Sequence, residues 1–141
     1  MITPVTRQIK VLVVDDSAFM RKVISDILEE DPRIKVIAKA RDGIDAVEKV
    51  LKLSPDVITL DVEMPRMDGI AALKEIMRLK PRPVVMVSSL TRKGTAVTIN
   101  ALALGAVDFV AKPSGAISLD MRAVAQELRE KVLVAASIDI E

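Results

Sequence analysis

Apolar residues occur along the chain in two patterns that alternate strictly. Short runs rich in β-branched residues predict buried strands at Ile9–Val14, Ile34–Ala38, Val57–Asp61, Val84–Val87 and Val107–Ala111. Longer segments with helical spacing predict helices at Ser17–Glu30, from Asp42-Gly43 to Ser54-Pro55, from Asp68-Gly69 to the residue before Pro81, at Lys93–Leu104 and at Asp120–Ala135. This order predicts an α/β fold with a doubly wound, five-stranded parallel sheet covered by helices on both faces.

Each predicted helix carries apolar residues that recur on one face and are expected to point into the core. In chain order they are Phe19, Met20, Val23, Ile24, Ile27 and Leu28; Ile44, Val47, Val50 and Leu51; Ile70, Leu73, Ile76 and Met77; Val97, Ile99 and Leu102; Met121, Val124, Leu128 and Val132. Asp68-Gly69 fits the start of the third helix, and Gly105 stands where a helix end favours a left-handed residue.

The 141 residues are enough for one domain with its own core. We expect that domain to span residues 9–135, after an amino-terminal extension (1–8) and before a tail or the start of a linker (136–141). The first residues lack the apolar stretch of a signal peptide, and every apolar run is too short to span a bilayer. The expected location is therefore the cytoplasm, without membrane insertion.

Composition narrows the chemistry. Lys and Arg number 21 against 20 Asp and Glu, so the net charge of +1 gives no general attraction to nucleic acid or membranes. The chain has no His and no Cys, which excludes imidazole bases, a Ser-His-Asp triad and thiol chemistry within it. An aromatic content of 1% argues against sites built on ring stacking. Carboxylates, hydroxyls and lysines remain.

Polar residues follow the predicted strands, and the carboxyl ends of parallel strands share one edge of the sheet. The residues expected to converge there are Asp15, Asp16, Asp61, Ser88 and Lys112. Each also has an ordinary structural interpretation: the Asp pair as a helix N-cap, Asp61 as a solvated strand end, Ser88 as a turn hydroxyl and Lys112 as a solvated side chain.

Together these residues are chemically complementary. Clustered carboxylates repel one another, and a hard cation with oxygen ligands such as Mg²⁺ relieves that repulsion. Asp15 and Asp16 would hold Mg²⁺, and Asp61 beside it would attack a phosphoryl group and become an aspartyl phosphate. Lys112 and Ser88 would then contact the phosphoryl oxygens.

Four motifs, in their order and spacing, resemble the receiver domain of two-component response regulators. They are Asp15-Asp16-Ser17, Asp61-Val62-Glu63-Met64-Pro65-Arg66-Met67-Asp68-Gly69, Val87-Ser88-Ser89 and Lys112-Pro113. The resemblance covers Ile9 to about Leu133 and implies the flavodoxin-like strand order 2-1-3-4-5. It also implies a histidine kinase as phosphodonor for Asp61, and Mg²⁺ held by Asp15, Asp16, Asp61 and the backbone carbonyl of Glu63.

The same resemblance implies a conformational switch. Phosphorylation would draw the Ser88 hydroxyl toward Asp61, and Phe109, at the aromatic switch position, would turn inward. The peptide bond between Lys112 and Pro113 is implied to be cis.

Within the receivers, the chain is most similar to the amino-terminal domain of chemotaxis protein-glutamate methylesterases. The stretches Asp16–Arg21, Asp61–Pro65, Met86–Thr91 and Gly105–Pro113 carry this likeness. It implies a methylesterase effector domain as partner, which this chain cannot itself supply because it has no His. The expected contact surface lies around the fourth helix, at Leu90, Val97, Ala101 and Leu104.

Two other functions fit parts of the pattern. A Mg²⁺-dependent phosphatase with an aspartyl-phosphate intermediate would need its nucleophile on the first strand as Asp-x-Asp, whereas that strand ends in Asp15-Asp16-Ser17. A flavin-binding carrier would need a phosphate loop after the first strand, where these two acids would repel the phosphate.

Overall fold

The computed structural model describes residues 8–89, 94–113 and 118–138. Its strands are β1 (Ile9–Val14), β2 (Ile34–Ala40), β3 (Val57–Leu60), β4 (Val84–Ser89) and β5 (Asp108–Lys112). Its helices are α1 (Ala18–Glu29), α2 (Gly43–Leu53), α3 (Gly69–Leu79), α4 (Gly94–Ala103), the 3-10 segment η1 (Ser118–Val124) and α5 (Ala125–Ala136). The strands pair in parallel in the order β2-β1-β3-β4-β5, so the predicted fold and strand order are confirmed.

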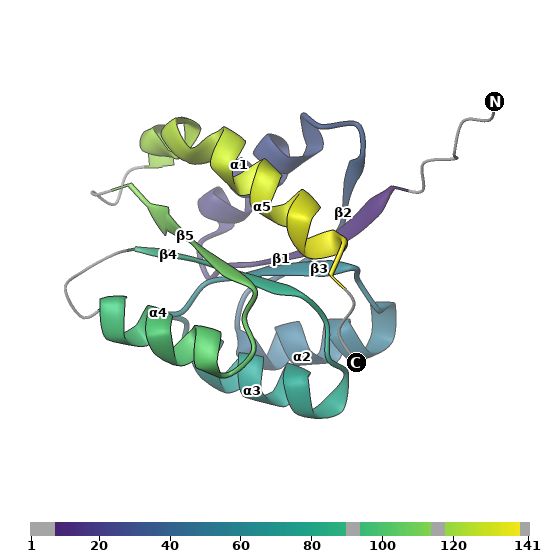
Figure 1. The fold of residues 1–141 in the computed structure, drawn as a ribbon, viewed down its shortest axis with the longest axis vertical. Helices are drawn as coiled ribbons and strands as arrows, with labels where there is room; N and C mark the ends of the chain where they lie inside the picture. Colours follow the sequence, from purple (N-terminus) through teal and green to yellow (C-terminus); the bar gives the residue numbers. More distant parts are fainter. Residues whose placement is uncertain (1–7, 90–93, 114–117, 139–141) are drawn as a thin grey trace.

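The sheet lies between two layers of helices, with α1 and α5 on one face and α2, α3 and α4 on the other (Figure 1). Side chains along each strand alternate between these layers: Val11 and Val13 pack with the α1 and α5 cluster, and Leu12 and Val14 with the other. Because β1 and β3 lie in the interior of the sheet, their carboxyl ends lie beside each other, where the polar residues that follow them meet.

The helix starts follow from local hydrogen bonding. Ser17 accepts a hydrogen bond from the Met20 amide at 3.2 Å, and Asp42 and Asp68 cap α2 and α3 in the same way. After α4, Gly105 has φ of 116°, as expected for a left-handed residue following a helix.

Five apolar side chains predicted to point inward are instead exposed, and for these the prediction was wrong. They are Phe19 (61% exposed), Ile44, Leu51, Ile99 (63%) and Leu102 (43%). The buried stripe of a helix is narrower than the set of apolar positions that fit its spacing. In α4 the residue wholly buried is Ala101, and the polar residues of Gly94–Ala103 are spread around the helix, so that no polar face marks the exposed side.

The last predicted helix, Asp120–Ala135, divides into η1 and α5, and Met121, Leu128 and Val132 are buried as expected. The domain limits of 9 and 135 stay a prediction, and most of the expected extension and tail (1–7 and 139–141) lies outside the described residues. None of the helices in the described part of the chain is long and apolar enough to cross a membrane.

Candidate functional site

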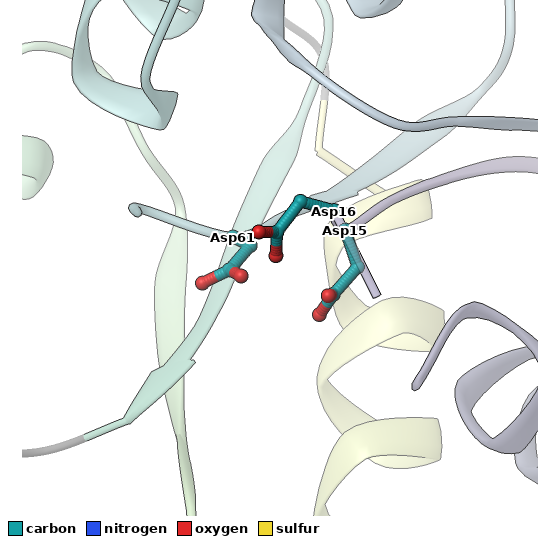
Figure 2. A group of neighbouring side chains, drawn as sticks. All are labelled: Asp15, Asp16 and Asp61. Atoms are coloured by element: carbon teal, nitrogen blue, oxygen red, sulfur yellow. The ribbon is translucent and has the colours of Figure 1, made fainter. Parts of the chain in front are cut away.

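Three carboxylates meet at the carboxyl edge of the sheet. Asp15 and Asp16 follow β1 and Asp61 follows β3, and one carboxylate oxygen from each lies within 4.8 Å of the others (Figure 2). Asp15 and Asp61 are buried, at 1% and 5% exposure, whereas Asp16 is exposed. The convergence predicted from the strand ends is therefore present in the structure.

Asp15 and Asp16 differ in burial because hydrogen bonds to the start of α1 hold Asp15 in place. The Oδ1 atom of Asp15 accepts the Ser17 amide at 2.9 Å, and its carbonyl oxygen accepts Arg21 Nη1 at 2.7 Å. Ser17 is the N-cap of α1. The alternative interpretation of the Asp pair as that helix's N-cap is thus wrong, and the Asp16 side chain faces solvent at the edge of the cluster.

Lys112, at the end of β5, reaches across the sheet edge to both buried acids. Its Nζ lies 2.7 Å from Asp15 Oδ2 and 3.3 Å from Asp61 Oδ2. Burial by itself lowers the pKa of Lys112, but the charges of Asp61 and Asp15 outweigh it and the pKa lies above its ordinary value. The two acids thus favour the charged form of Lys112, which makes it unsuited to act as a base.

Asp61 has more negative charge around it than the protein neutralises. Its Oδ1 accepts the Val62 amide at 2.8 Å, and the buried Ser88 hydroxyl of β4 donates to the same carboxylate. Burial raises the pKa of Asp61, Lys112 partly opposes this, and the charge of Asp15 adds to the rise. One lysine therefore serves two buried carboxylates, which leaves a net negative charge at the site.

The donor set fits a divalent cation. Mg²⁺ takes oxygen ligands at about 2.0–2.1 Å in octahedral geometry, so opposite ligands stand about 4.2 Å apart. Carboxylate oxygens already within 4.8 Å of one another need little movement to reach that spacing. The Glu63 side chain is exposed, and the role expected for its backbone carbonyl stays a prediction.

Close backbone packing holds Asp61 at its place. The Gly69 amide donates to the Val62 carbonyl at 2.7 Å, and a Cβ at Gly69 would lie 2.0 Å from the Asp61 carbonyl oxygen. A side chain at residue 69 therefore cannot fit without moving the backbone of Asp61. In the sequence the only signal for this packing is the Asp68-Gly69 pair, and that pair indicates the start of a helix.

The expected cis peptide bond is not found. The described residues contain no cis peptide, so the prediction for Lys112 and Pro113 was wrong. The trans form of a peptide bond before proline is favoured by about 0.5–1 kcal/mol unless tertiary contacts select cis, and Lys112 reaches both acids with the bond trans.

The residues expected to contact an effector domain are only partly on the surface. Ala101 is fully buried, so its assignment to an interface was wrong. Val97 and Leu104 are partly buried, and Leu90 lies outside the described residues. The large apolar residues that are exposed in the described part of α4 are Ile99 and Leu102.

These features define a class of protein. The chain belongs to the response regulator receiver domain family, whose sequence profile matches residues 11–124. The receiver domain of NarL from Mycobacterium tuberculosis has the same fold, with 28% identity and a TM-score of 0.80 over 94% of this chain and 99% of that one.

Within the family, the chain is similar to CheB. The crystal structure of the response regulator domain of Thermotoga maritima CheB is 57% identical, with a TM-score of 0.90 over 95% of this chain and all of that one. A protein-glutamate methylesterase/protein-glutamine glutaminase of Symbiobacterium thermophilum is 65% identical over 94% of this chain and 37% of its own length. One from Oceanobacillus iheyensis is 57% identical over 96% and 38%. The chain thus spans just over a third of these curated relatives.

Proposed function

We propose that this chain is the phosphoacceptor domain of a chemotaxis response regulator and that Asp61 receives its phosphoryl group from a histidine kinase in the cytoplasm. The observation that carries the proposal is the buried Asp61 carboxylate, placed between two further acids and one lysine. Such a carboxylate is a nucleophile that a cation can bring to an anionic phosphoryl group.

The chain's residues have distinct roles in the transfer. A carboxylate oxygen of Asp61 attacks phosphorus, and the bond from phosphorus to the donor histidine nitrogen breaks with its electron pair staying on that nitrogen. Lys112 and the Ser88 hydroxyl, which contact the Asp61 carboxylate, would then contact the transferred oxygens. When bound by Asp15, Asp16, Asp61 and the Glu63 carbonyl, Mg²⁺ would supply the positive charge that offsets the converging anions.

Phosphorylation of the chain by a small acyl phosphate tests the acceptor directly. With Mg²⁺ present, the parent should gain one phosphoryl group by intact mass, and Asp61→Asn should gain none. Asp26→Asn, which changes an exposed acid on α1, is the matched control and should label like the parent. Labelling of Asp61→Asn at the parent's rate would show that Asp61 is not the acceptor.

We further propose that Ser88 and Phe109 form the switch, in a modified form. Because Ser88 already donates to Asp61, phosphorylation would transfer this hydrogen bond to a phosphoryl oxygen instead of drawing a distant hydroxyl inward. The Phe109 ring is partly buried against the α2, α3 and α4 cluster, and its carbonyl accepts Lys131 Nζ of α5 at 2.8 Å. A change at Phe109 would therefore reach α5.

Ser88→Ala tests this coupling. The variant should still accept the phosphoryl group, while backbone amide shifts in α4, β5 and α5 on phosphorylation should be much smaller than in the parent. Ser25→Ala, which removes another buried hydroxyl far along α1, should keep the full response. Undiminished shifts in Ser88→Ala would refute the switch.

Finally, we propose that the domain restrains a methylesterase effector, the activity named for its curated relatives. The exposed Ile99 and Leu102 on α4 provide an apolar contact surface. The unphosphorylated chain should inhibit a separate methylesterase domain, and acyl phosphate with Mg²⁺ should relieve that inhibition. Ile99→Asp should abolish inhibition, and Leu79→Asp on α3 should not. Esterase turnover by this chain alone would overturn the assignment.

A further inference from the structure

The segment that joins β3 to α3, residues 61–69, is held from the side by the start of α2. We call this segment the acceptor loop, since it begins with Asp61 and contains Glu63. We propose that Asp42 and Gly43 are positioning residues for the acceptor reaction: they lock the acceptor loop in the geometry that Mg²⁺ binding and phosphoryl transfer require. This inference rests on the proposed function of Asp61.

Gly43 packs tightly against the acceptor loop. Its amide donates to the Met67 carbonyl at 2.8 Å. A Cβ at Gly43 would lie 2.4 Å from that carbonyl oxygen and 2.7 Å from Met67 Cγ. Any side chain here would push the loop away, so glycine is required by the contact between the two segments.

Asp42 binds both α2 and the acceptor loop. Its carboxylate is buried, at 2% exposure, and its Oδ1 accepts the Asp45 amide at 2.8 Å as the cap of α2. The Nε of Arg66, in the acceptor loop, lies 3.3 Å from Asp42 Oδ2. An ion pair with a buried partner is screened less by solvent than one on the open surface, so it can hold the loop in register.

The backbone of the acceptor loop needs such support. Arg66 has φ of 68°, a left-handed conformation that costs a residue with a side chain about 1–2 kcal/mol. The Met67 amide donates to the Pro65 carbonyl at 2.7 Å, which closes a tight turn around Arg66. Conformations of this kind persist where surrounding contacts impose them, and Asp42 and Gly43 bind the two residues at the turn.

The other end of the acceptor loop packs on the acceptor itself. Gly69 donates to Val62, and the Asp61 carbonyl fills the space where a Gly69 side chain would stand. Glu63 lies between this fixed end and the turn held by Asp42 and Gly43. Loosening the turn would displace Glu63 while Asp61, Ser88 and Lys112 keep their own contacts.

Magnesium affinity of the unphosphorylated chain tests the inference, because a purely structural role of Asp42 would leave it unchanged. Asp42→Asn keeps the helix cap, as Asn caps about as well as Asp, but removes the charge that pairs with Arg66. We expect the Kd for Mg²⁺, measured by calorimetric titration, to rise about 10-fold, the lower end of the effect of residues that support metal ligands. Arg66→Ala should raise it equally, and the double variant no further.

Two more variants complete the design. Gly43→Ala should raise the Kd at least as much as Asp42→Asn. Val50→Ala removes buried methyl groups from the second half of α2 and leaves the Asp42–Arg66 ion pair and the Gly43–Met67 hydrogen bond in place, so it should lower the melting temperature and leave the Kd unchanged. If Gly43→Ala fails to fold, Arg66→Ala alters only an exposed side chain and still decides the matter.

The outcomes separate this inference from the proposed function. A parent that labels with acyl phosphate, together with Asp42→Asn and Arg66→Ala variants within twofold of its Kd, would overturn the inference alone. If the losses of Mg²⁺ affinity in Asp42→Asn and Arg66→Ala added up in the double variant, the inference would also be overturned. A parent that neither binds Mg²⁺ nor labels would overturn both. Slower labelling in Asp42→Asn that excess Mg²⁺ restores would support the inference.

Discussion

Asp61→Asn is expected to stabilise the folded chain in the absence of divalent cations. Asn is close to Asp in size and can still accept the Val62 amide, but it carries no charge. The substitution leaves Lys112 paired with Asp15 at 2.7 Å, one cation with one buried anion. The acceptor carboxylate is thus a group that the fold tolerates at a cost when no metal is bound.

The distances set the size of the effect. With an effective dielectric of about 20, carboxylate oxygens within 4.8 Å repel by about 3.5 kcal/mol or more for each pair, so Asp15 and Asp16 together contribute about 7 kcal/mol against a charged Asp61. With the same dielectric, the attraction between Asp61 and Lys112 at 3.3 Å is about 5 kcal/mol. Burial of the charged Asp61 carboxylate adds a further cost, whereas the repulsion from the exposed Asp16 is screened by solvent. We therefore expect Asp61→Asn to gain about 1–2 kcal/mol, or about 3–6 °C in melting temperature.

The sign of the pH dependence follows from the raised pKa of Asp61. Below the ordinary value of 3.8, Asp61 is protonated in the folded and the unfolded chain, and it imposes no electrostatic penalty. As the pH rises through the raised pKa of the folded state, stability is lost from the parent and not from Asp61→Asn. The gap between their melting temperatures should therefore open with increasing pH.

Calorimetric melting of both chains in chelator, from acid to neutral pH, measures this gap. Asp26→Asn removes an exposed acid paired with Lys22 at 2.9 Å and should change stability by no more than about 0.5 kcal/mol. Mg²⁺ at ten times its Kd should stabilise the parent by about 1.4 kcal/mol and Asp61→Asn by much less. If Asp61→Asn melted below the parent at neutral pH in chelator, the charge argument would be refuted.

Two further predictions concern packing around the site and in the core. Gly69→Ala should cost about 3 kcal/mol in urea denaturation and slow phosphorylation about 100-fold, because its Cβ would meet only the backbone of Asp61 and Val62; normal labelling would contradict the close-approach argument. Leu128→Ala, at a fully buried position of α5, should lower the free energy of unfolding by about 2–5 kcal/mol. Val134→Ala, at an exposed position of the same helix, should lower it by less than about 0.5 kcal/mol, and phosphorylation should be unchanged in both variants. Equal losses of stability would show that the buried face of α5 is wrongly assigned.

The sequence by itself determined the order of elements and the edge where the site forms. Runs such as Val57–Leu60 are buried on both faces and end at a polar residue, so the position of Asp61 follows from the pattern alone. Parallel strands bring their carboxyl ends to one edge, and Asp15, Asp61 and Lys112 meet there as expected. Strand periodicity and helix caps are local properties of the chain, so they can be recognised without knowing which elements pack together.

Only the tertiary structure decided the features that depend on contacts between distant segments. Helical spacing could not show that Ala101 is buried while Ile99 is exposed, because the polar residues of α4 do not gather on one side and only the packing of the helix on the sheet selects a face. The sequence could not predict the trans peptide bond before Pro113 either, since the cis and trans forms differ by only about 0.5–1 kcal/mol. The contact of Asp42 with Arg66 joins two loops whose approach depends on how α2 and α3 pack, and no spacing in the sequence encodes it.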